Sequence, residues 1–167
     1  AVGTFDGTTM KLYLNSVLRS QNDNPNLNVV AGGQHFMGKS TYYGDRYFRG
    51  LLDEVAVFDR ALTSSEVLSL YQAGGVDPSM VALWHFDEGA GSTAFDSSGN
   101  GNNGTIEGAS WADGKVGKAL RFNGDSQYVS IPQGILSGSQ PFSIGAWVSR
   151  DADASGWRSV LVYGQEW

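Results

Sequence analysis

Residues 80–133 read MVALWHFDEGAGSTAFDSSGNGNNGTIEGASWADGKVGKALRFNGDSQYVSIPQ, and they contain the most informative pattern in the chain. An apolar run over residues 81–86 leads into a loop rich in Gly, Asn, Asp and Ser. Two segments of alternating character follow, at residues 119–123 and 127–132. Short runs with a period of two, separated by turn residues, are typical of antiparallel strands in a sandwich or barrel.

The rest of the chain repeats this strand pattern. Residues 47–59 alternate most clearly, and the alternation places Asp53 on the same strand face as the two valines that follow it. Residues 142–149 also alternate, with Trp147 on the outward face. Residues 20–28 (SQNDNPNLN) predict a polar loop, because Asn, Asp, Ser and Pro favour turns.

One segment has the signals of a helix instead. Thr63-Ser64-Ser65-Glu66 is a capping box, and Leu62 and Val67 are spaced to form a hydrophobic staple. Gly74 suits the left-handed residue that commonly follows the last helical turn. The sequence therefore predicts a single short helix between these signals.

Longer groups of residues resemble a known family. WHFDEGAGSTAFDSSGNGNNGTI (84–106) followed by GKALRFNGDSQYVSIP (117–132) resembles the opening of a LamG-like jelly-roll domain, of the concanavalin A-like lectin/glucanase superfamily. AVGTFDGTTMKLYLNS (1–16) and YFRGLLDEVAVFDRALTSSEVLSLYQAG (47–74) resemble its closing strands and terminal helix. The resemblance implies an all-β fold: a jelly-roll β-sandwich of two antiparallel sheets with one short helix.

The two portions stand in the reverse of the family's order. Residues 1–75 are expected to form the C-terminal portion of a sandwich, residues 76–79 a linker, and residues 80–167 the N-terminal portion of the same permuted domain or of the next repeat. The family usually has a hairpin between the strands near Val160 and Val2, which we do not find here. Open strand edges invite pairing with another chain, so copies of the protein or adjacent repeats are the expected partners.

Composition narrows the function classes. The formal net charge is −6 and the basic residues form no cluster, which argues against a nucleic-acid partner. No apolar run reaches the roughly 20 residues needed to cross a bilayer, so membrane insertion is not expected. The chain has no cysteine, and 41% of its residues are hydrophobic. The family resemblance implies an extracellular or cell-surface location.

The loop at residues 96–104 is a candidate calcium site. It offers a carboxylate and several amides, and Ca²⁺ takes six to eight oxygen ligands. The resemblance implies an ion between the first loop and the last strand, which matches Asp96 and Asp53. The amides of the loop add Asn100 and Asn103 to the expected ligands. The alternative is that Asp96 and Asn100 cap Asx-turns and that Asp53, predicted to point inward, accepts backbone hydrogen bonds.

Aromatic side chains on strands and loops are candidate sugar contacts, because sugars stack on rings bordered by amides and carboxylates. The expected ligand-binding residues are Trp147, Trp157, Tyr43 and Tyr13. The alternative for Trp147 is burial beneath the helix or in a sheet core.

An enzyme is not expected. Related glucanases carry carboxylates at alternate strand positions. Here Ala56 stands where the middle carboxylate would be needed, and Glu54 and Asp59 fall on opposite faces of the strand. The leading hypothesis is a non-catalytic extracellular structural or adhesive module, a repeat unit of a filament or large surface protein that assembles head to tail by strand sharing. The alternative is a carbohydrate-binding module of a polysaccharide-active protein, and a glycoside hydrolase is a weaker one.

Overall fold

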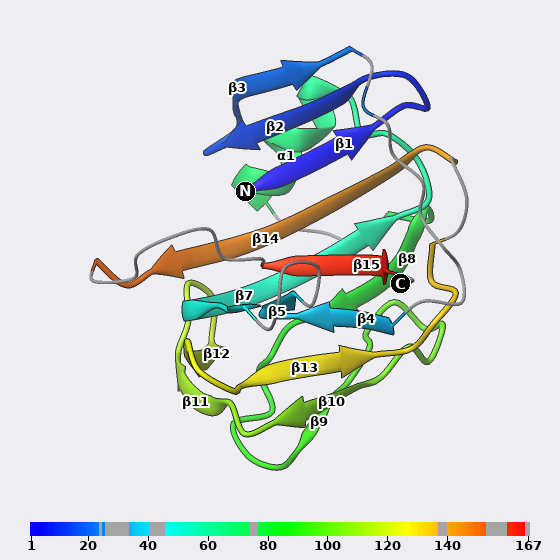
Figure 1. The fold of residues 1–167 in the computed structure, drawn as a ribbon. Coiled ribbons are helices and arrows are strands. Elements are labelled where there is room, and N and C mark those ends of the chain that lie inside the picture. The colour runs from blue at the N-terminus through cyan, green and yellow to red at the C-terminus, as the bar shows by residue number, and fades with distance from the viewer. Residues whose placement is uncertain are drawn as a thin grey trace.

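The computed structural model describes residues 1–23, 25, 34–40, 46–73, 77–136, 140–152 and 160–165 (Figure 1). The strands in them are β1 (Val2–Phe5), β2 (Met10–Leu14), β3 (Val17–Asn22), β4 (Gln34–Met37), β5 (Lys39–Ser40), β6 (Arg46–Tyr47), β7 (Arg49–Phe58), β8 (Met80–Trp84), β9 (Thr93–Ala94), β10 (Gly104–Glu107), β11 (Ser110–Asp113), β12 (Lys118–Asn123), β13 (Tyr128–Ile131), β14 (Phe142–Arg150) and β15 (Leu161–Gln165). The helix is α1 (Ser64–Ala73).

These strands form two main antiparallel sheets, which confirms the predicted sandwich. The larger sheet has the order β11-β12-β7-β14-β1-β2-β3, with β8 also paired to β7, and the smaller has the order β15-β4-β13-β10-β9. Strands β5 and β6 form a separate ladder. Strands from residues 1–75 and from residues 80–167 are interleaved in both main sheets.

The main core lies between the two sheets. Its large side chains are almost fully buried, as expected where apolar faces of two sheets meet. They include Met37, Phe48, Leu52, Val55, Val57, Trp84, Phe86, Leu120, Phe122 and Val129. The inward face of β14 follows the predicted alternation, since Phe142 and Ile144 pack against this core.

A β-bulge at Glu54 changes the phase of β7. Its register against β14 shifts at this point, and Glu54 adopts a left-handed φ of 51°. Leu52 before the bulge and Val55 after it both pack in the main core. Asp53 lies opposite Trp147, on the other face of the sheet. The prediction that Asp53 shares a face with the following valines is therefore wrong, because the extra residue of a bulge reverses the alternation.

Helix α1 covers the outer face of the larger sheet, behind β1 and β2 in Figure 1. A second buried cluster holds the two together, and it comprises Tyr13, Ala56, Phe58, Leu62, Val67, Met80 and Leu83. The predicted capping box is confirmed, because Glu66 Oε2 accepts the Thr63 N–H at 2.7 Å and Thr63 Oγ1 accepts the Glu66 N–H at 3.3 Å. The staple residues Leu62 and Val67 are both buried in this second cluster.

The cap predicts a pH-dependent contribution to stability. Hydrogen bonds from Arg60, and then from the Thr63 N–H and hydroxyl, lower the pKa of Glu66 to about 2. Because the folded pKa lies below the ordinary value of 4.5, this contribution is complete above pH 4.5 and is lost as the pH falls towards 2. We expect urea unfolding curves of Glu66→Gln to lose less stability over this range than the wild type. The exposed Glu107→Gln is the control, and equal slopes for all three proteins would contradict the prediction.

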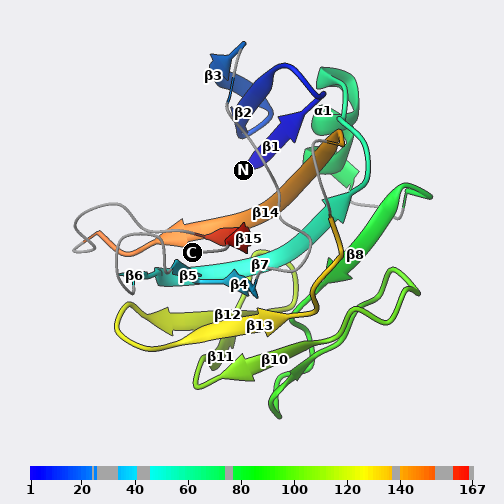
Figure 2. The ribbon, with the colours of Figure 1, turned by 45° about the vertical axis from the view of Figure 1, so that its right-hand side comes forward.

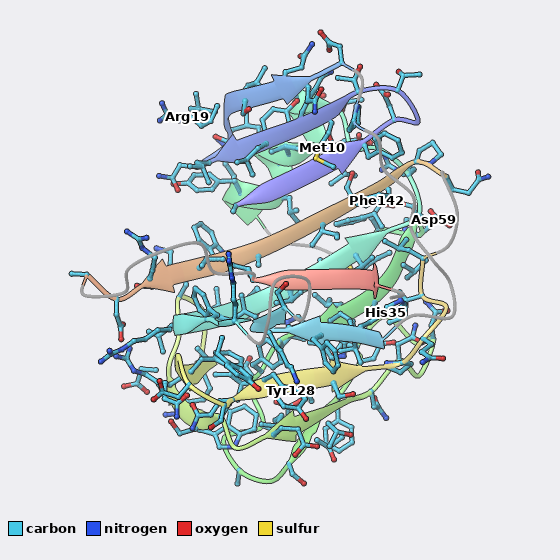
Figure 3. The ribbon with its side chains drawn as sticks, viewed as in Figure 1. Met10, Arg19, His35, Asp59, Tyr128 and Phe142 are labelled. Carbon is cyan, nitrogen blue, oxygen red and sulfur yellow. The ribbon has the colours of Figure 1, made fainter. Side chains whose placement is uncertain are left out.

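Strand β3 occupies residues 17–22, so the predicted polar loop is wrong over residues 20–22. The hairpin before it turns at Asn15 and Ser16, whose φ values of 50° and 61° fit a type I′ turn. Every residue of β3 is exposed, and Figure 3 shows Arg19 projecting from this edge. The sequence also predicts a short strand at residues 27–31, which lie outside the described residues.

The two sheets differ in extent. Figure 2 shows that β1, β2 and β3 extend beyond the five-stranded sheet, which lies against the other end of the larger one. The order of the smaller sheet ends with β15 on this side. The larger sheet therefore presents one covered half and one half that projects past its partner.

Candidate functional site

Asp96 is the centre of a hydrogen-bonded loop. Its Oδ1 accepts the N–H groups of Leu83 and Ser98, each at 2.9 Å. Its Oδ2 accepts the Asn102 N–H and the Ser98 hydroxyl, also at 2.9 Å. Burial alone would raise the pKa of Asp96, but these hydrogen bonds outweigh burial and hold it below its ordinary value.

The amides of the same loop saturate the free edge of β8. The Val81 carbonyl accepts Nδ2 of Asn102 at 2.8 Å and Nδ2 of Asn100 at 3.2 Å. Asn103 Oδ1 accepts the Asp96 N–H at 2.8 Å. The loop thus takes the place of a neighbouring strand, which accounts for its richness in Asp, Asn and Ser.

Asp53 holds a different loop. Its Oδ2 accepts the N–H groups of Lys115 at 2.7 Å and of Val116 at 3.0 Å. Its side chain is only 2% exposed, and Oδ1 receives no hydrogen bond. Burial, with the nearby Asp87 carboxylate adding to it, raises the pKa of Asp53 despite the backbone donors.

The predicted calcium ligands do not make one shell. Asp96 and Asp53 organise separate loops. Both carboxylate oxygens of Asp96 already accept hydrogen bonds, and Asn103 Oδ1 accepts one from a backbone N–H. Within the described residues, no group of three or more His, Asp and Glu side chains is placed to hold a metal ion. These donors do not fit a calcium ion shared by Asp96 and Asp53, and calcium binding itself stays a prediction.

A pocket of about 520 Å³ lies between α1 and the outer face of the larger sheet. It is lined by Trp147 and Tyr13, two of the four predicted sugar contacts. Tyr13 is 3% exposed and its hydroxyl lies 3.1 Å from Ser64 Oγ, so it belongs to the floor rather than to an open platform. Trp157 and Tyr43 lie outside the described residues, and sugar binding by all four stays a prediction.

Trp147 is held by its neighbours in this pocket. The ring of Tyr71, on α1, lies 5.2 Å from it with an interplanar angle of 44°. Lys115 Nζ lies 5.4 Å from the centre of the Trp147 ring, within the range of a cation–π contact. The alternative reading of Trp147, a residue packed beneath the helix, agrees with these contacts.

The pocket also contains a hydrogen-bonded pair that the sequence did not reveal. His85 Nδ1 lies 2.8 Å from Glu54 Oε2. Burial raises the pKa of Glu54, and the nearby carboxylates of Asp53 and Asp87 raise it further. The hydrogen bond with His85 acts in the opposite direction and lowers it. The residues are 31 positions apart, and only the bulge in β7 and its pairing with β8 bring them together.

One comparison with known proteins gave a match. The family model described as the concanavalin A-like lectin/glucanases superfamily covers residues 1–68. This is the superfamily that the sequence resembles. No curated protein and no solved structure matches the chain. Among the described residues, no helix is both long and apolar enough to span a membrane.

The superfamily's name covers both lectins and glucanases, so the match leaves binding and hydrolysis open. Glu54 lines the pocket, whereas Asp59 is exposed just after β7 ends and does not line it (Figure 3). Glycosidases need two carboxylates that face one bond from a short distance. These two residues do not provide that arrangement.

A second aromatic group, missed from the sequence, is shared between the smaller sheet and the β5–β6 ladder. Lys39 Nζ lies 4.9 Å from the ring centre of Tyr128, 5.3 Å from that of Phe36 and 5.6 Å from that of Tyr47. The Phe36 and Tyr128 rings meet edge to face at 5.4 Å. Cross-strand aromatic pairs of this kind stabilise sheets, so the packing of strands accounts for this group without a bound ligand.

Proposed function

We propose that this protein is a non-catalytic extracellular module with a structural or adhesive role, and that it associates with further copies through the projecting half of its larger sheet. The observation that carries this proposal is an apolar trio, Leu12, Leu14 and Val17, on the β2–β3 hairpin. These side chains are 41%, 42% and 51% exposed. Exposed apolar side chains that cluster on one face often mark a surface that binds another protein.

The trio lies on the face of the sheet opposite α1. Leu14 is directly opposite Val17 in the ladder, and Leu12 alternates with the buried Tyr13, which faces the helix. Gly3 is the partner of Leu12 on β1, and no atom lies within 4 Å of the position that its Cβ would take. Space is therefore available for an apolar layer from another molecule over this face.

Two sheet edges border the same region. Strand β3 ends the larger sheet, and β15 ends the smaller one on the side where the larger sheet projects. An added strand pair on β15 would extend the smaller sheet over the trio, at the place of the hairpin that the family usually has. Main-chain pairing would supply affinity and the apolar side chains would supply specificity. The strands that one copy adds come from a different surface than the edge that receives them on the next copy. Such contacts therefore join copies head to tail.

A triple variant, Leu12→Ser, Leu14→Ser and Val17→Ser, tests the proposal. We expect the wild-type mass in size-exclusion light scattering to rise with concentration, and the dissociation constant of the variant to be at least about tenfold higher. Leu68→Ser, which removes a leucine that is 42% exposed on α1, is the matched control. A wild type that stays monomeric at every concentration, or a variant that associates equally well, would show that the trio has no such role.

A further inference from the structure

We infer that the pocket between α1 and the larger sheet binds a small organic amine, with an apolar body on the pocket floor and an ammonium group at Glu54. This inference does not depend on association through the projecting half-sheet, because the pocket is on the opposite face. It rests on the lining of the pocket, on the placement of its carboxylate and on the position of Lys115.

The floor of the pocket is apolar. Val67 from α1, Leu83 from β8 and Ala56 from β7 are 0%, 6% and 3% exposed and line it from three elements. A volume of about 520 Å³ is within the range of pockets that hold small organic molecules. Such a surface favours a ligand with a hydrocarbon body.

The polar wall of the pocket holds a carboxylate. Glu54 is held in a left-handed conformation at the bulge, which turns its side chain into the pocket beside His85. Strained residues of this kind often occur at functional sites. The carboxylates of Asp53 and Asp87 lie close enough to Glu54 to raise its pKa. A cation at this wall would be attracted most strongly by Glu54, and more weakly by Asp53 and Asp87, which do not line the pocket.

Lys115 already places an ammonium group in the pocket. Lys115 Nζ lies over the Trp147 ring, whose other neighbour in the pocket is Tyr71. This contact shows that the aromatic wall accepts a primary ammonium. Lys115 also determines where the ammonium group of a ligand would bind, because its charge repels a second cation from Trp147 and directs it towards Glu54. An amine bound there would form a charge-assisted hydrogen bond with the Glu54 carboxylate.

Three probes with one hydrocarbon body separate the possible head groups: hexylamine, hexanol and hexanoate. Each is titrated at neutral pH into the full chain labelled with ¹⁵N, and the amide shifts are followed. We expect the amine to bind about tenfold more tightly than the alcohol, with the largest shifts at Glu54, Lys115 and Trp147. Equal affinities, a preference for hexanoate, or shifts that map elsewhere would overturn the inference. Binding in the pocket of a neutral hexose, in place of the amine, would also overturn it.

Two variants tie the preference to named groups. Glu54→Gln keeps the side-chain shape and should lower the affinity for hexylamine to that for hexanol, whereas Glu107→Gln on the smaller sheet should leave it unchanged. Lys115→Met removes an exposed charge and should strengthen hexylamine binding several-fold, so it tests the inference even if Glu54→Gln does not fold. Unchanged hexylamine affinity in Glu54→Gln, or in Lys115→Met, would contradict it.

Discussion

Asp96→Ala is expected to destabilise the protein by about 3 kcal/mol, because it removes the shared acceptor of three backbone N–H groups. Those of Leu83, Ser98 and Asn102 all lie 2.9 Å from its carboxylate oxygens. They are partly buried, so water replaces the lost acceptor only incompletely. For a chain of this size the thermal midpoint should fall by roughly 10 °C, which calorimetry or circular dichroism can measure.

Asp96→Asn provides the graded comparison. The amide retains one oxygen but its nitrogen cannot accept the Asn102 N–H, so we expect an intermediate loss. Asp125→Ala, at an exposed position, is the control for removing one negative charge. An alanine variant at position 96 as stable as this control would contradict the role assigned to the loop.

The same unfolding experiment tests calcium. A ligand that binds only the folded state raises its midpoint. The sequence-based expectation of a calcium site predicts such a rise. The geometry favours the opposite result, because the oxygens of Asp96 already accept the chain's own donors, so that millimolar calcium or a chelator would leave the wild-type midpoint unchanged. A calcium-dependent rise that disappears in Asp96→Ala would instead establish Asp96 as a calcium ligand.

Structural features that depend on only a few neighbouring residues were predictable from the sequence. The capping box at Thr63–Glu66 needs only local geometry, and the structure confirms it together with the helix it starts. The alternation of β12 and β14 was also predictable, because each strand has one face on the main core. Burial of Asp53 was anticipated, although through the wrong face of β7.

The features that the sequence did not predict depend on single-residue offsets in a strand and on pairing between distant residues. The bulge at Glu54 adds one residue to β7, and nothing in an apolar alternation marks such an insertion. The pair of Glu54 and His85 follows from that offset, so no spacing in the sequence could suggest it. Strand β3 was missed because a fully exposed edge strand shows no alternation between apolar and polar residues. Its only local sign was the Asn15-Ser16 turn.

Gly50→Ala is expected to cost roughly 3 kcal/mol or more, since it adds steric overlap to an unfavourable backbone conformation. Gly50 has a φ of 147° on β7, where strands β12 and β14 pair on either side. Its Cβ would overlap the Ser149 carbonyl oxygen and approach Arg150 Cα to 3.0 Å. Both are backbone atoms of a central ladder, so neither can move without disturbing β14.

Two other glycines divide this cost into its parts. Gly89 has a φ of 68° but open space around its Cβ position, so Gly89→Ala should show only the conformational cost of about 1 kcal/mol. Gly3 has open space and no positive φ, and Gly3→Ala should be neutral within about 0.5 kcal/mol. Urea unfolding of the three variants should therefore rank them Gly50, Gly89 and Gly3. A Gly50 variant no less stable than the Gly89 variant would mean that β7 and β14 separate at this point, and that the close approach of the two strands is not required by the fold.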